Sequence, residues 1–276
     1  MGLVALALIG CTAGPSIESK VSDVRVLGAR VDPAEPAPGD LVTIDVLIAD
    51  PSPESLEIAV WSCTDLGTGC LEAAGGAALT VWRGATNTGF VRASALVPPA
   101  LAGLLQNPEL TELPVSLWVL ACPTGACPVI DAIDAAPAPG TPAADDLASQ
   151  LADPPSLLAE LPLGESALSS QDVHVSLRPE AERNHNPGPL LLLPPDAAPV
   201  GEAVFVQLGT SDPDGDVVEV LSLSDVGGFP AGFRVGDAVD FTRPEDAPEG
   251  PIRVWMVARD GRGGFAFAAD TVFTSP

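Results

Sequence analysis

The chain has 276 residues, of which 37 are acidic and 12 are basic, so its formal net charge is −25. This excess of acid argues against nucleic acid as a partner, because such binding depends on Lys and Arg side chains that neutralise phosphates. Hydrophobic residues make up 46% of the chain, too many for a wholly disordered polypeptide. No run of them reaches the roughly 18 residues that a membrane-spanning helix needs.

Residues 1–10, MGLVALALIG, are apolar and lead directly into Cys11. The run LIGC at 8–11 resembles the bacterial lipobox, in which small residues before a cysteine permit cleavage and the thiol receives a diacylglycerol. The resemblance implies a lipoprotein signal peptide over 1–10, a lipidated Cys11 and a tether over 11–22. It places the chain in the bacterial cell envelope, anchored at the periplasmic or surface face of the outer membrane. The apolar stretch is short and no basic residue precedes it, as a misassigned start codon would explain; a frayed tail with an incidental cysteine is the alternative.

The segments that follow alternate apolar and polar residues with a period of two, which is typical of β-strands with one buried face. In 42–48, Val42, Ile44 and Val46 alternate with side chains that include Leu47. The same alternation recurs at 56–60, 115–121 and 252–258, and clusters of Gly, Pro and Asp separate these segments. Short strands punctuated in this way predict an all-β fold built as antiparallel sandwiches.

The chain also resembles itself. Residues 37–54 align without a gap on residues 199–216, and Trp118 in 114–121 aligns with Trp255 in 251–258. Two matches in the same order indicate a duplicated domain. We therefore predict a first domain over 23–180 and a second over 184–276, with their boundary in 178–186.

Residues 131–170 differ in kind, being rich in Ala, Pro and Asp with few β-branched residues. They form either an elaborated loop of the first domain or a linker. Asp145 and Asp146, followed by LASQLA, favour one short helix, since acidic residues stabilise a helix N-terminus. A last strand around Val173 and Val175 would then complete the first domain.

The Pro-Gly turn, the alternating strand and the following Asp-Pro resemble the immunoglobulin-like repeats of bacterial surface lipoproteins. The second copy resembles the cadherin-like and PKD-like subset: it opens with Asn186-Pro187, carries SDPDGD at 211–216 and ends near ARDGRGG at 258–264. The resemblance implies two tandem immunoglobulin-like antiparallel β-sandwiches. In the resembled repeats the opening Asn, the mid-domain acids and the late Asp hold calcium. Carried over, that set is Asn186, Asp212, Asp214 and Asp260, with Asp216 optional.

Three close carboxylates repel one another unless they share a cation or are hydrated, and hard cations take oxygen ligands. Asp-Pro-Asp-Gly is equally a good turn sequence without any metal. Both interpretations stay open for the second copy. In the first copy Ser52 and Pro53 replace Asp214 and Gly215, so no metal is expected there.

Four cysteines remain beside Cys11, an even number that suits an oxidising compartment. They form two close pairs, Cys63 with Cys70 and Cys122 with Cys127. Local bridges within each pair are favoured because each closes a turn without a tertiary contact. A bridge between Cys63 and Cys122 is the rival. The spacings and the scarcity of His argue against zinc.

No catalytic motif stands out, and the sequence context of His174 and His185 suggests surface positions rather than bases. The four Trp fall in strand-like segments and are expected to pack. We therefore expect a non-enzymatic, lipid-anchored envelope protein that acts as a spacer or as an adhesion and interaction module, with calcium stiffening its second domain. Its partners would be the membrane, through Cys11, and an unidentified protein or glycan. The alternative is a carbohydrate- or ligand-binding accessory lipoprotein of an envelope complex.

Overall fold

The computed structural model describes residues 20–50, 55–63, 80–85, 90–107, 110–135, 141–153, 156–157, 159, 161–162 and 165–272. Cys11, Cys70, Ser52 and Pro53 lie outside these residues, as do the predicted signal peptide and most of the tether. The elements are β1 (Arg25–Asp32), β2 (Leu41–Ala49), β3 (Ser55–Cys63), β4 (Thr80–Ala85), β5 (Phe90–Leu96), α2 (Leu101–Leu104), β6 (Glu112–Pro123), α3 (Pro128–Asp134), α4 (Pro142–Ala152), β7 (Ala167–Ser176), η1 (Glu180–Glu182), β8 (Leu191–Leu193), β9 (Ala203–Gly209), β10 (Glu219–Ser224), β11 (Arg234–Val235), β12 (Ala238–Thr242), β13 (Ile252–Arg259) and β14 (Phe265–Val272).

The first sandwich packs a three-stranded sheet, in the order β1-β2-β5, against a four-stranded sheet, in the order β4-β3-β6-β7. All of its strand pairs are antiparallel. The alternating residues Val42, Ile44 and Val46 enter the core between the sheets, together with Ile58 and Val119. The predicted last strand is β7, which pairs with β6 along ten residues. The all-β prediction is therefore confirmed.

The second sandwich repeats this layout strand for strand. Its three-stranded sheet has the order β12-β9-β8 and its four-stranded sheet the order β11-β10-β13-β14, so β8 to β14 take the places of β1 to β7. The turns that open the matching strands β2 and β9 correspond as well. Gly39 (φ 90°) and Gly201 (φ 72°) both have the positive φ that favours glycine. The internal repeat of the sequence thus corresponds to a repeat of topology.

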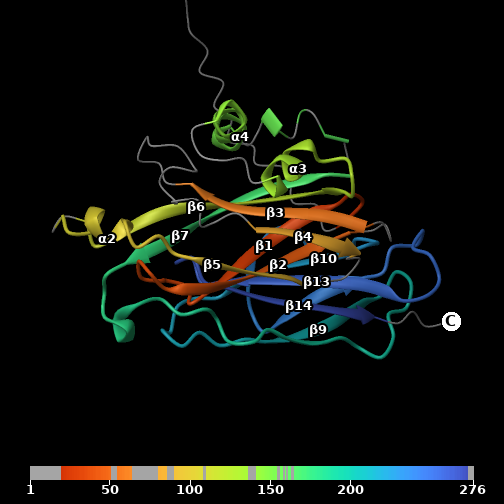
Figure 1. Cartoon of the computed structure of the whole chain (residues 1–276). Helices are drawn as coiled ribbons and strands as arrows, with labels where there is room; N and C mark the ends of the chain where they lie inside the picture. The colour runs from red at the N-terminus through yellow and green to blue at the C-terminus, as the bar shows by residue number, and fades with distance from the viewer. Residues whose placement is uncertain are drawn as a thin grey trace, which may run out of the picture.

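The two sandwiches are stacked face to face (Figure 1). The outer face of the β1-β2-β5 sheet presents Leu47 and Ala49 to the four-stranded sheet of the second sandwich, where they meet Leu223, Trp255 and Val257 in a buried cluster. Arg253 adds a polar contact, because its guanidinium binds Asp225 of its own sandwich at 3.1 Å and donates to the Asp50 carbonyl of the other at 3.1 Å. The stack is thus continuous from one sandwich to the next.

The stack corrects one expectation, that of strands buried on a single face. Leu47, on the face opposite Val46, is 0% exposed, and so is Trp255, on the face opposite Met256. Apolar residues on both faces of β2 and β13 reflect layers on both sides of the sheet. Leu47 and Trp255 are covered in this way, whereas Leu41, at the start of β2 on the same face as Leu47, is 72% exposed.

Residues 131–170 contribute the end of α3, the whole of α4 and the start of β7. The segment is an elaboration of the first sandwich, and it yields α4 where one helix was expected, while α3 was not foreseen. Both helices cover the outer face of the β4-β3-β6-β7 sheet, where Ile130 and Leu151 pack on Trp61 and Leu120 (Figure 1). The Thr141 hydroxyl caps α4, since it accepts a hydrogen bond from the Ala144 amide at 3.3 Å.

No helix in the described part of the chain is long and apolar enough to cross a bilayer.

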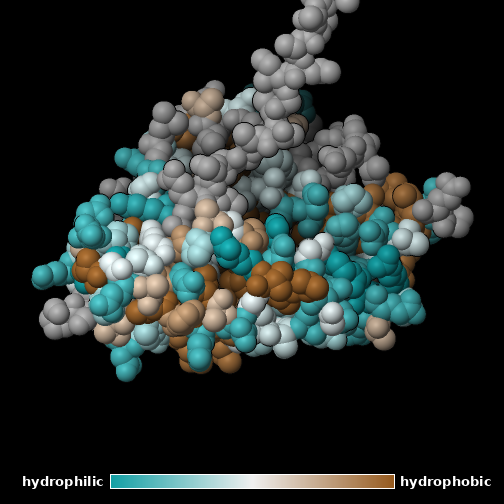
Figure 2. Space-filling model, turned by 180° about the vertical axis from the view of Figure 1, so that it is seen from behind, coloured by the Kyte–Doolittle hydropathy of each residue, from teal (hydrophilic) through white to brown (hydrophobic). Residues whose placement is uncertain are grey.

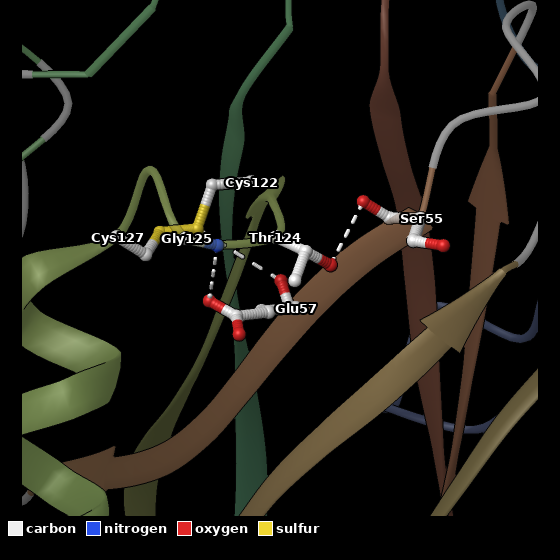
Figure 3. Close-up of a disulfide and its surroundings, with 6 residues drawn as sticks. All are labelled: Ser55, Glu57, Cys122, Thr124, Gly125 and Cys127. Atoms are coloured by element: carbon white, nitrogen blue, oxygen red, sulfur yellow. Dashed lines mark hydrogen bonds between the residues drawn. A yellow bond between two sulfur atoms is a disulfide. The ribbon is translucent and has the colours of Figure 1, made fainter.

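A disulfide joins Cys122, at the end of β6, to Cys127, which precedes α3 (Figure 3). This is the local bridge that the sequence favoured, and it excludes the rival bridge from Cys122 to Cys63. Thr124 and Gly125 tie the enclosed turn to β3, since the Thr124 hydroxyl donates to the Ser55 carbonyl at 3.1 Å and the Gly125 amide donates to the Glu57 carboxylate at 3.3 Å. The bridge therefore fixes the point from which the helical layer begins.

Candidate metal-binding site

The acidic triplet lies in the turn between β9 and β10. One oxygen of Asp212 accepts from the backbone amides of Asp214 at 2.8 Å and Asp216 at 3.1 Å, so the turn wraps around this carboxylate. Gly215 supplies the positive φ of 81° that the turn needs. As a result, Asp212, Asp214 and Asp216 each offer an oxygen within 4.8 Å of the others.

Cationic and polar groups from two other segments approach the triplet. His185, in the connection between the sandwiches, donates its backbone amide to Asp214 at 2.8 Å and places Nδ1 at 3.0 Å from the other carboxylate oxygen. Arg262, in the β13–β14 turn, binds Asp216 at 3.1 Å. Desolvation works to raise the pKa of Asp214, but the His185 hydrogen bonds and the charges of His185 and Arg262 outweigh it and hold that pKa below its ordinary value.

Asp260 precedes Arg262 by two residues in the β13–β14 turn, and it is 6% exposed. One of its oxygens accepts from the Arg262 amide at 2.7 Å and from the Gly264 amide at 3.0 Å. The other accepts from the Asn184 side-chain amide at 2.9 Å. Gly264 has no room for a Cβ, which would overlap this carboxylate. Asp260 therefore organises the β13–β14 turn and ties it to the connection between the sandwiches.

Asn186 joins the two sandwiches directly. Its side-chain amide donates to the Val31 carbonyl at 2.7 Å, at the end of β1, and its side-chain oxygen accepts from the Phe265 amide at 3.0 Å, at the start of β14. Two residues earlier, the Asn184 backbone amide donates to the carboxylate of Glu35 at 2.9 Å. These contacts fix the connection to both sandwiches.

The five residues nominated from the sequence thus gather at one junction, in two adjacent groups. Asp212, Asp214 and Asp216 form a carboxylate cluster. The side chains of Asn186 and Asp260 instead make hydrogen bonds that hold the junction together. The cluster fits a hard cation, because Asp212 keeps one buried oxygen without a hydrogen-bond partner and three carboxylates supply oxygen ligands.

The sequence did not predict the part that Glu35 and Asn184 play at this junction, where each is 2% exposed. The Asn184-x-Asn186 spacing was the available signal, since alternate residues of an extended segment share a face.

Each of the two histidines pairs with one carboxylate. His174 pairs with Glu112 at 3.3 Å on the surface of the β6–β7 pair, and His185 pairs with Asp214. In the described part of the first sandwich, a cavity of about 50 Å³ lies between the sheets, with Leu101 of α2 in its lining, and that lining contains no titratable residue. Neither histidine lines this cavity.

The tryptophans whose side chains are described pack inside the protein. Trp61 is 1% exposed and Trp255 is 0% exposed. Trp118 is partly buried and stacks on Trp61 with a centroid separation of 6.4 Å. Trp61 and Trp118 form part of the contact with the helices and Trp255 part of the contact between sandwiches, so they make no exposed aromatic row for sugar rings.

No family model matches the chain, and no curated protein matches it. Among solved structures, the chain resembles the fibronectin(III)-like modules of Clostridium thermocellum CbhA, with 13% identity over 90% of this chain and 94% of that one and a TM-score of 0.29. It also resembles a chimeric titin Z1Z2 tandem, with 12% identity over 93% and 98% of the two chains and a TM-score of 0.29.

A third similar structure is a nucleoside hydrolase-related protein from Saccharophagus degradans, with 18% identity and a TM-score of 0.29. That match covers 35% of this chain and spans only 27% of the length of the other protein. Scores of this size assign the chain to none of these families. The sandwich architecture rests on the sheets themselves.

Proposed function

We propose that the chain is a non-enzymatic, lipid-anchored module of the bacterial cell envelope that holds a rigid pair of β-sandwiches away from a membrane for interaction with a partner. The observation that carries this proposal is the face-to-face stack, with Trp255 and Leu47 both 0% exposed between the sandwiches. A stack joined in this way moves as one body, which suits a spacer or a docking platform.

The course of the N-terminal segment supports the same proposal. The Val21 amide donates to the Ser224 carbonyl at 2.8 Å, at the end of β10, and the Val21 side chain is 1% exposed in the cluster between the sandwiches. A tether that enters there would pull on both sandwiches at once. The carbohydrate-binding alternative has less support, because Trp61 and Trp255 are buried.

Lipid anchoring is tested at Cys11. In a Gram-negative host, Cys11→Ser should leave an unprocessed precursor that does not incorporate labelled fatty acid, and globomycin should have the same effect on the wild-type chain. Pulse-labelling and gel mobility measure both. Normal processing of Cys11→Ser would refute the anchor, whereas Cys127→Ser serves as the cysteine control and should be processed normally.

Calcium is the second element of the proposal, and it is tested on the whole stack, since the second sandwich alone would expose Trp255. At a calcium concentration about 100 times the Kd, binding should stabilise the fold by about 2.7 kcal/mol and raise Tm by roughly 5–10 °C. Asp212→Asn should abolish the rise, because it keeps the oxygen that accepts the turn amides but removes the charge. The exposed Asp246→Asn is the matched control. An equal rise in Tm for the wild type and Asp212→Asn, or no rise in either, would refute calcium binding at the triplet. The segment would then be a turn that holds no metal.

A further inference from the structure

The layers of the molecule are covered unequally. In the first sandwich, α3 and α4 cover the outer face of the four-stranded sheet, and the second sandwich covers the part of the three-stranded sheet around Leu47 and Ala49. The outward side chains of β5 and of Leu41 in β2 stay exposed. In the second sandwich, the first covers the four-stranded sheet. Among the described residues, no helix and no other sheet covers the outer face of the β12-β9-β8 sheet, which carries exposed apolar side chains.

Three of these side chains lie on one face of two neighbouring strands. Leu191 and Leu193 of β8 are 60% and 59% exposed, and Phe205 of β9 is 70% exposed. Leu193 pairs with Gln207, two residues from Phe205 on the same face, so the Leu193 and Phe205 side chains are diagonal neighbours. Hydrophobic residues reach the surface between hydrophilic ones along the lower side of Figure 2, where the β12-β9-β8 layer lies. Leu191, Leu193 and Phe205 are called the open face below.

The repeat shows what such a face does elsewhere in this chain. The matching face of the first sandwich, on β1, β2 and β5, is the one that buries Leu47 against Trp255. A second copy of the chain cannot dock on the open face in the same manner, because its four-stranded sheets are covered by helices in one sandwich and by the first sandwich in the other. Two open faces that paired with each other would bring their acidic side chains together, and like charges repel, so a different protein is favoured as the partner.

Charge identifies the chemistry of that protein. Asp240 pairs directly with Phe205 across the β9–β12 ladder. The segments that precede and follow β8, β9 and β12 carry further exposed acids, which we call the acidic rim: Asp196, Glu202, Asp237, Glu245, Asp246 and Glu249. Most arginines of the second sandwich are already engaged: Arg253 with Asp225, Arg259 with Glu219 and Arg262 with Asp216. An apolar centre with an acidic rim complements a partner with an apolar centre and a basic rim.

Addition of a strand at the edge of β8 is a poorer mode of docking. Pro189, Pro194 and Pro195 flank this three-residue strand and lack the amide donors that a longer ladder needs. The side chains of the face, rather than the backbone of the edge, are left to make the contact. An anionic membrane surface or a nucleic acid would be repelled by the rim.

We propose that the open face, with its acidic rim, docks a cationic amphipathic polypeptide segment. This inference rests on the proposed role of the chain as an interaction module and names the chemistry of its partner. The apolar side chains of the segment would cover Leu191, Leu193 and Phe205, and its Lys or Arg residues would pair with Asp240 and the rim.

The test uses residues 11–276 with Cys11→Ser, so that neither the apolar segment 1–10 nor an acyl chain competes, and a fluorescent 14-residue amphipathic peptide of Leu and Lys at physiological salt. Anisotropy should show binding, and Leu193→Ser with Phe205→Ser should weaken it by about tenfold or more, the effect of losing two buried apolar side chains. Phe205→Leu should retain most of the affinity. Asp240→Asn should weaken binding by about threefold and reduce its dependence on salt.

Leu41→Ser, at a side chain that is 72% exposed on the first sandwich, is the matched control and should change the affinity less than about twofold. Equal affinity of the wild-type chain and the double Ser variant for the peptide would overturn the proposal. Equal affinity for a peptide with Glu in place of Lys would also overturn it. So would binding to phosphatidylcholine vesicles without binding to the peptide. Precursor processing and the calcium response do not involve the open face, so failure here is distinguishable from failure of the proposed function.

Discussion

Replacing Trp255 with Ala lowers the free energy of unfolding by about 3–5 kcal/mol, the range for a fully buried aromatic side chain. Trp255 is 0% exposed and packs between the sandwiches with Leu47 and Leu223, so its loss leaves a cavity that two rigid sheets cannot close. Denaturant unfolding followed by far-UV circular dichroism measures the change. Trp255→Phe should lower the free energy of unfolding by less than the lost apolar contact area suggests. The reason is that the variant also removes the buried Nε1 of Trp255, which has no hydrogen-bond partner.

The control for this prediction is Phe205→Ala, which removes an aromatic ring that is 70% exposed and should shift stability by no more than about 0.5 kcal/mol. A Trp255→Ala protein as stable as wild type would mean that the sandwiches do not pack on this face. The spacer proposal would then lose the rigid stack that supports it.

Replacing Asp260 with Ala lowers the free energy of unfolding by about 2–4 kcal/mol, since it leaves buried donors without acceptors. The Arg262 and Gly264 amides and the Asn184 side chain all donate to this carboxylate. The variant should also be cleaved faster by proteases in the connection between the sandwiches. Chemical denaturation and limited proteolysis measure the two effects.

Asp260→Asn is the matched variant and should cost less, because rotation of the Asn184 amide would present its oxygen, which has no hydrogen-bond partner, to the new NH₂ group. Asp246→Ala, at an exposed position in the β12–β13 loop, should leave both stability and cleavage unchanged. Stability of Asp260→Ala equal to wild type would show that this network does not hold the junction.

The face-to-face stack differs from the end-to-end arrangement that a spacer of tandem domains would have. Tandem domains joined end to end would add their lengths, whereas these sandwiches share a broad apolar face and a polar junction. Arg253 spans the face through Asp50 and Asp225, and Asn186 spans the junction through Val31 and Phe265. The protein gains rigidity rather than reach, which suits the presentation of one fixed surface.

The sequence by itself predicted the strands with the clearest alternation and their duplication, but not β1, β4, β5, β8, β11, β12 or β14. Alternation in 42–48 and 252–258 predicted β2 and β13, and the match of Trp118 with Trp255 predicted two copies of one topology, because strand formation and turn chemistry are local. The acidic triplet was also visible, since its members lie within a single turn.

Only the tertiary structure decided what covers each sheet. Leu47 and Trp255 lie on the faces that simple alternation assigns to solvent, and they are buried because another layer of the same chain packs there. The matching face at Leu193 and Phe205 stays open, although its strands obey the same local rules. Periodicity fixes which side chains share a face, but burial of that face depends on contacts between segments far apart in the chain.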